Sequence, residues 1–153
     1  MNKLIFTILA LPVIFAQMPM TASESGKPGI LAVAQQDSVF KGRFYNKEYS
    51  IYIDMDLYHQ NRLIQGQEFL GEVPGYLGDN KDARKWIFTD ASIKDSLTAN
   101  LSITNDYGSE DLEATLTYNP KDSTYVLKQG EGRTIKIARN RKWVKLPGSI
   151  VFK

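Results

Sequence analysis

The chain has no cysteine and only one histidine, and these two shortages exclude much of the chemistry that enzymes use. Without cysteine there is no disulfide, no thiol nucleophile and no thiolate metal ligand. A structural zinc site takes four Cys or His ligands, so a single histidine excludes its usual form. A Ser-His-Asp triad would have to use His59, and no G-x-S-x-G segment presents a serine. We expect no catalytic residue, no metal site, no cofactor and no enzymatic activity. A small enzyme that works with Asp or Glu alone is the remaining alternative.

The first 23 residues are typical of a secretory signal peptide. Lys3 supplies the positive charge, and residues 4–16 (LIFTILALPVIFA) form an uncharged apolar run. A membrane-spanning helix needs about 18–20 apolar residues, so this run is too short, and Pro12 interrupts it. A buried N-terminal helix is the alternative. We expect a secreted or periplasmic protein with no transmembrane segment in its mature form, and the lack of cysteine favours a bacterial source.

Two further segments follow the predicted signal. Residues 24–38 (ESGKPGILAVAQQDS) are mostly small, polar or flexible, which predicts a flexible N-terminal arm. Residues 39–153 predict a single antiparallel β domain, because apolar and polar residues alternate between turn signals. The clearest alternation is at 49–57 (YSIYIDMDL). The complete set of expected strands is 40–45, 49–57, 67–73, 85–93, 98–104, 112–118, 125–129, 134–138, 143–146 and 149–152.

Turn residues separate these strands so that neighbours in sequence form hairpins. The segments 119–122 (NPKD), 129–132 (QGEG) and 147–148 (PG) predict turns. Four glycines between positions 66 and 78 predict a bulged strand with turns around Pro74, or alternatively a mobile loop over a binding mouth. About 8–10 short strands in sequential hairpins predict a small antiparallel up-and-down barrel with a lipocalin-like layout; a β-sandwich is the alternative. The sequence has no early G-x-W, so no family is assigned.

Charge is distributed unevenly along the predicted domain. Residues 35–120 carry 8 Lys and Arg against 14 Asp and Glu, whereas residues 121–153 carry 9 against 2. A basic cluster with an interleaved aromatic is suited to an anionic group. The cluster predicted to bind a ligand is Arg139, Arg141, Lys142, Trp143 and Lys145. Alternatively, barrel closure lets these basic strands neutralise the acidic early strands.

Other side chains are candidates for recognition or ion binding. The carboxylates of Asp54 and Asp56 share a strand face, but nothing around them has the register of a calcium loop. The same holds for the acidic loop at 106–111. We expect both sets to be solvated or ion-paired. Tyr52 and Tyr58 point away from the apolar face of their strand, which predicts cross-strand pairs or a surface that stacks sugars or binds a protein.

These patterns predict a non-enzymatic secreted or periplasmic binding module whose ligand is unknown. The partner is unknown; the candidates are an anionic ligand and a protein, and secretion argues against nucleic acid. One alternative is an inhibitor of a secreted protease or other hydrolase that uses the 24–38 arm. A second alternative is a carrier of a small apolar ligand inside the barrel.

Overall fold

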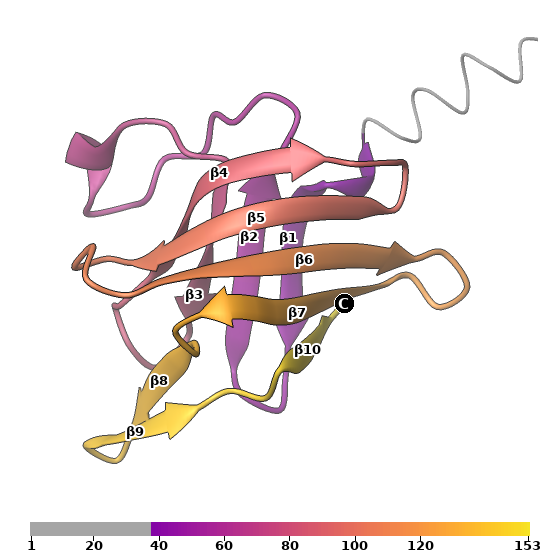
Figure 1. Ribbon diagram of the computed structural model, residues 1–153. Helices are drawn as coiled ribbons and strands as arrows, with labels where there is room; N and C mark the ends of the chain where they lie inside the picture. The colour runs from indigo at the N-terminus through magenta and orange to yellow at the C-terminus, as the bar shows by residue number, and fades with distance from the viewer. Residues whose placement is uncertain (1–37) are drawn as a thin grey trace, which may run out of the picture.

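The computed structural model describes residues 38–153; the predicted signal peptide and nearly all of the predicted arm lie outside this range. Eight strands form one antiparallel sheet in the order β1-β2-β3-β4-β5-β6-β7-β10, and β8 and β9 form a separate hairpin. Strands β4 to β7 cross in front of β1 to β3 (Figure 1). The elements are β1 (Lys41–Asn46), β2 (Ile51–Asp56), η1 (Glu68–Leu70), β3 (Gly75–Asp79), β4 (Trp86–Ile93), β5 (Thr98–Asn105), β6 (Asp111–Asn119), β7 (Thr124–Gly132), β8 (Lys136–Arg139), β9 (Lys142–Lys145) and β10 (Ser149–Phe152).

The first and last strands lie side by side and nearly close the sheet into a barrel (Figure 1). Tyr45 and Lys153 exchange two backbone hydrogen bonds, with N–O distances of 2.8 and 2.9 Å. Asn46 adds a side-chain bond from Nδ2 to the carbonyl of Val151 at 2.9 Å. The predicted small antiparallel barrel is therefore confirmed.

Every second side chain of a strand points inward, and these side chains fill the barrel interior. Ile51, Ile53 and Met55 of β2 are buried, as the pattern at 49–57 predicts. In β4 the alternation changes phase, because a bulge between Phe88 and Asp90 inserts one extra residue. Phe88 before the bulge and Ala91 after it therefore both face the main core. Simple alternation would place these two residues on opposite sides of the strand.

Strand β3 differs from the sequence-based expectation. The sequence predicts a strand at 67–73, but that segment contains the short helix η1, and the strand begins at Gly75. A Cβ atom at Gly75 would lie 2.7 Å from the Asp54 carbonyl oxygen, and one at Gly78 would lie 2.3 Å from the Tyr52 ring. These glycines allow close approach to β2 and do not mark turns. The predicted turn at 129–132 is also wrong, because these four residues form the last part of strand β7, which ends at Gly132.

The long connection between β2 and β3 covers the outside of the barrel. Ile64 is fully buried there and forms a second apolar cluster with Val73, Tyr76 and Ile87. Phe69, at the tip of the same connection, is 83% exposed. No helix within residues 38–153 is long and apolar enough to cross a bilayer.

Candidate functional site

The β8–β9 hairpin carries all five residues of the basic cluster predicted from the sequence. Its turn residues, Asn140 and Arg141, have φ values of 51° and 63°, as a type I′ turn requires. Asparagine tolerates this left-handed conformation better than most residues. Cross-strand partners share a face, and Ala138 pairs with Trp143. Lys136 is two residues before Ala138 in β8, so it points to the same side of the hairpin. Trp143 and Lys136 therefore share one face of the hairpin, its outer face.

The opposite face of the hairpin closes one end of the barrel. Ile137 and Leu146 are buried in the main core. Arg139, two residues after Ile137, binds Asp79 through Nη1 at 2.6 Å and Nη2 at 3.0 Å. The Asp79 side chain is only 4% exposed. Arg139 therefore fastens the hairpin to β3, on the other side of the hairpin from Trp143.

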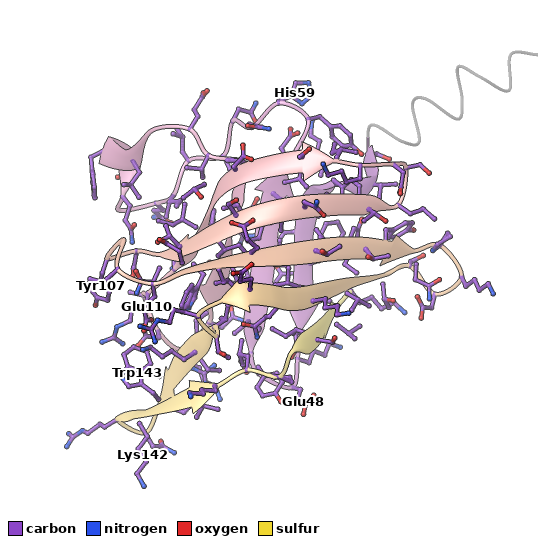
Figure 2. All side chains as sticks on the ribbon, in the orientation of Figure 1. Glu48, His59, Tyr107, Glu110, Lys142 and Trp143 are labelled. Atoms are coloured by element: carbon purple, nitrogen blue, oxygen red, sulfur yellow. The ribbon has the colours of Figure 1, made fainter. Side chains whose placement is uncertain are left out.

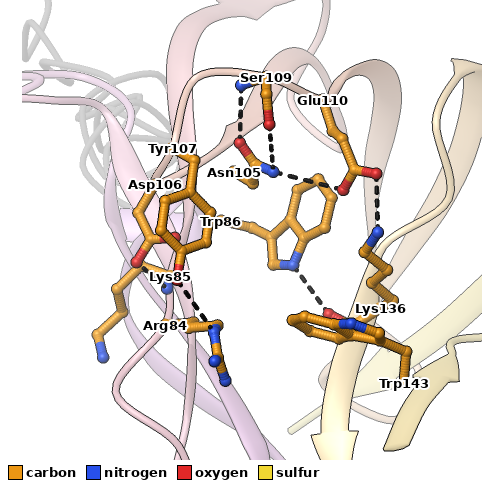
Figure 3. Close-up of a pocket in the computed structure, with 10 residues that line it drawn as sticks. All are labelled: Arg84, Lys85, Trp86, Asn105, Asp106, Tyr107, Ser109, Glu110, Lys136 and Trp143. Atoms are coloured by element: carbon orange, nitrogen blue, oxygen red, sulfur yellow. Dashed lines mark hydrogen bonds and ion pairs between the residues drawn. The ribbon is translucent and has the colours of Figure 1, made fainter.

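A cleft of about 190 Å³ lies between the outer face of the hairpin and the loop that joins β5 to β6 (Figure 3). Trp86 lies deepest: it is 4% exposed, and its Nε1 donates a hydrogen bond to the Lys136 carbonyl at 3.1 Å. Trp143 and Tyr107 are 53% and 69% exposed. The lining residues are Arg84, Lys85, Trp86, Asn105, Asp106, Tyr107, Ser109, Glu110, Lys136 and Trp143.

Two cations contact the indole ring of Trp143. The Cζ of Arg84 and the Nζ of Lys136 each lie 5.1 Å from the ring centre, within the range of a cation–π interaction. Lys136 also forms an ion pair with Glu110 at 2.8 Å. A hydrogen bond to the Tyr107 hydroxyl raises the pKa of Arg84, which stays charged. These contacts hold the Trp143 ring in place while leaving about half of it exposed.

Internal hydrogen bonds order the loop that forms the other wall of the cleft. The Oδ1 of Asn105 accepts from the backbone of Ser109 at 3.0 Å, and its Nδ2 donates to Glu110 at 3.3 Å. The carboxylate of Asp106 accepts from the backbone of Lys85 at 3.1 Å. This wall is therefore formed before any ligand arrives, which reduces the entropy cost of binding.

The structure separates the five residues predicted to bind a ligand. Trp143 lines the cleft, and Arg141 and Lys142 line an adjacent hollow at the hairpin tip, also bordered by Trp143. Lys145 is exposed farther along the outer face of the hairpin. Arg139 is held in the internal ion pair described above. Arg141, Lys142 and Trp143 therefore border one hollow, whereas Arg139 and Lys145 lie outside it.

Sequence reasoning missed the residues that complete the cleft from elsewhere in the chain. One signal for them exists: the tripeptide Arg-Lys-Trp occurs twice, at 84–86 and 141–143. The tryptophans of both copies line the cleft. The acidic loop, expected to be solvated or ion-paired, contributes Glu110 to the cleft as the ion partner of Lys136.

The remaining candidates lie elsewhere. His59 lies away from the end where Tyr107, Glu110 and Trp143 gather (Figure 2), and its Nδ1 is 3.0 Å from the Asp56 carboxylate. Asp56 is buried rather than surface-exposed, and the backbone hydrogen bonds that it accepts where the chain turns after β2 compensate for its burial. Within residues 38–153 no three His, Cys, Asp or Glu side chains are arranged to hold a metal ion.

Comparisons with protein-family models, with curated proteins and with solved structures found no match. The function therefore has to be inferred from the geometry and charge of the cleft and the hairpin. The feature that distinguishes them is an exposed indole ring that is contacted by two cations.

Proposed function

We propose that this chain is a secreted or periplasmic binding module, without catalytic activity, that recognises its ligand at the cleft around Trp143. The observation that carries the proposal is that Trp143 is 53% exposed and yet held by Arg84 and Lys136. A fixed, exposed indole offers a large apolar face whose immobilisation costs little entropy. Such side chains are enriched at the centres of recognition surfaces.

The size of the cleft limits what it could hold. Pockets that enclose a drug-sized ligand have volumes of about 300 Å³ or more, whereas this cleft has about 190 Å³. It would therefore receive one ring-sized part of a larger ligand. The barrel interior is filled by side chains such as Phe40, Phe88 and Phe152, all fully buried, which favours a surface ligand over a carried one.

A fragment screen by NMR tests the proposal while the ligand itself is unidentified. The two indole N–H signals would be assigned with Trp143→Phe, which removes one of them. Ring-sized fragments that bind are expected to shift the Trp143 signal, and the matched variant Phe69→Ser, at an exposed aromatic in another loop, should leave those shifts unchanged. Fragments that bind elsewhere and leave the Trp143 signal in place would contradict the proposal. So would a hydrolytic activity that one point substitution abolishes.

A further inference from the structure

Trp143 separates two neighbouring hollows. On one side is the cleft described above; on the other is a hollow of about 500 Å³ between the hairpin tip and the loop that joins β3 to β4. Arg84 and Trp143 line both. A ligand longer than one ring could therefore lie across the indole and contact both hollows. The residues of the second hollow are Lys81, Asp82, Arg84, Ala138, Asn140, Arg141, Lys142 and Trp143.

The second hollow is strongly basic. It contains four cationic side chains and one carboxylate, that of Asp82, which is already paired with Arg84 at 2.7 Å. Lys81, Arg141 and Lys142 are exposed, and among residues 38–153 their side chains form no ion pair or hydrogen bond. Three free cations around one hollow attract an anionic group.

The cleft on the other side of Trp143 has nearly balanced charge, because the carboxylates of Asp106 and Glu110 line it together with Arg84, Lys85 and Lys136. These cations already have partners: Lys136 pairs with Glu110, Arg84 pairs with Asp82, and Lys85 donates to the carbonyl of Ala83. The carboxylates accept hydrogen bonds from hydroxyls, and they repel a second carboxylate or a phosphate. The exposed indole offers an apolar face on which the C–H groups of a sugar ring can pack. This side therefore suits an uncharged, hydroxyl-rich ring.

We infer that the ligand is an acidic glycan in which charged and uncharged sugar units alternate. This inference rests on the proposed function, because it assigns the ligand class of the same site. An uncharged ring would pack on Trp143 in the cleft, and the next unit would place its carboxylate or sulfate beside Arg141 and Lys142. A nucleic acid fits less well, since it carries a phosphate at every unit and would bring one of them into the cleft, where the cations already have partners.

Three defined probes test the ligand class by calorimetry. They are a hyaluronan octasaccharide, in which glucuronate and N-acetylglucosamine alternate, the uncharged chitohexaose, and an eight-residue oligothymidine. The hyaluronan octasaccharide is expected to bind most tightly, and its affinity should fall between about 50 and about 200 mM salt as cationic contacts are screened.

Substitutions on the two sides of the site should have different signatures. Trp143→Ala should weaken hyaluronan binding about tenfold, whereas Trp143→Phe, which keeps an aromatic ring, should retain most of the affinity. The double variant Arg141→Ser/Lys142→Ser should weaken binding about fivefold and reduce its salt dependence. Its matched control is Lys121→Ser/Lys128→Ser, which removes two charges away from the site and should change affinity less than about twofold.

The outcomes separate this inference from the proposed function. If oligothymidine or chitohexaose binds as tightly as the hyaluronan octasaccharide, or if that octasaccharide does not bind, the acidic-glycan inference is overturned. The proposed function survives that result if fragments still shift the Trp143 signal. If fragments bind without shifting the Trp143 signal and Trp143→Ala leaves every affinity unchanged, the proposed function and the acidic-glycan inference are both overturned.

Discussion

Arg139 and Asp79 are 60 positions apart in the sequence and form an ion pair through two hydrogen bonds, at 2.6 and 3.0 Å. Arg139 also donates a hydrogen bond to the carbonyl of Tyr49. The pair links the β8–β9 hairpin to the end of β3 and so fixes the position of the candidate cleft. The stability of this end of the barrel should therefore depend on it.

Asp79→Ala should lower the free energy of unfolding by about 3 kcal/mol, because it leaves a partly buried guanidinium without its carboxylate. Urea denaturation measures this change. The control is Arg43→Ala, which breaks an ion pair with Asp54 in which the arginine side chain is 46% exposed. That loss should cost less than about 1 kcal/mol. Equal losses for the two variants would show that the Asp79 pair has no special structural role.

Asp56 should make stability depend on acid pH. Burial opposes its ionisation, but hydrogen bonds from the backbone and ring of His59, together with the charge of Lys41, outweigh this and lower its pKa below the ordinary 3.8. A carboxyl with a lowered folded-state pKa adds stability above its unfolded pKa and loses it as pH falls through the folded value. The free energy of unfolding should therefore fall as the pH drops below about 4.

Substitutions at this pair test the origin of that fall. Asp56→Asn should flatten the decline measured by urea titrations at a series of acid pH values. His59→Gln should flatten it only in part, because the backbone N–H of residue 59 still donates to Asp56. A decline of unchanged slope in Asp56→Asn would assign the acid sensitivity to other carboxylates.

The connection between β2 and β3 combines one anchoring and one exposed apolar residue. Ile64 is fully buried in the outer cluster, so Ile64→Ala should cost about 2–4 kcal/mol of stability. Phe69 is 83% exposed, so Phe69→Ser should change stability by less than about 0.5 kcal/mol. Thermal and urea unfolding of the two variants measure the contrast. A large loss for Phe69→Ser would mean that its ring packs on the barrel in solution.

The two tryptophans should be distinguishable by fluorescence quenching. Trp143 is 53% exposed and Trp86 only 4%, so acrylamide should quench mainly Trp143. Trp143→Phe should leave a blue-shifted emission that acrylamide quenches poorly. Strong quenching of the remaining emission would show that the cleft opens widely enough to expose Trp86.

Local alternation is enough to predict much of the barrel. The strand predicted at 149–152 coincides with β10, and the pattern at 49–57 contains β2. Such strands can be predicted from the sequence because the two-residue period of a strand is a local property of the chain. The bulge after Phe88 is not predictable in this way, because it is defined by pairing with β5. Strand β3 is not predicted because its glycines are explained only by the backbone and side chains of β2, against which they pack.

The site shows the same division. The sequence by itself determined the β architecture, the lack of cysteine chemistry and the accumulation of positive charge after residue 120. It did not determine which of those charges are free. Arg139 and Arg141 lie two residues apart in the same basic stretch, yet one is neutralised by Asp79 and the other is exposed at a turn. Only the tertiary structure decides this, because the partner of a charge is set by contacts between segments that are distant in the sequence.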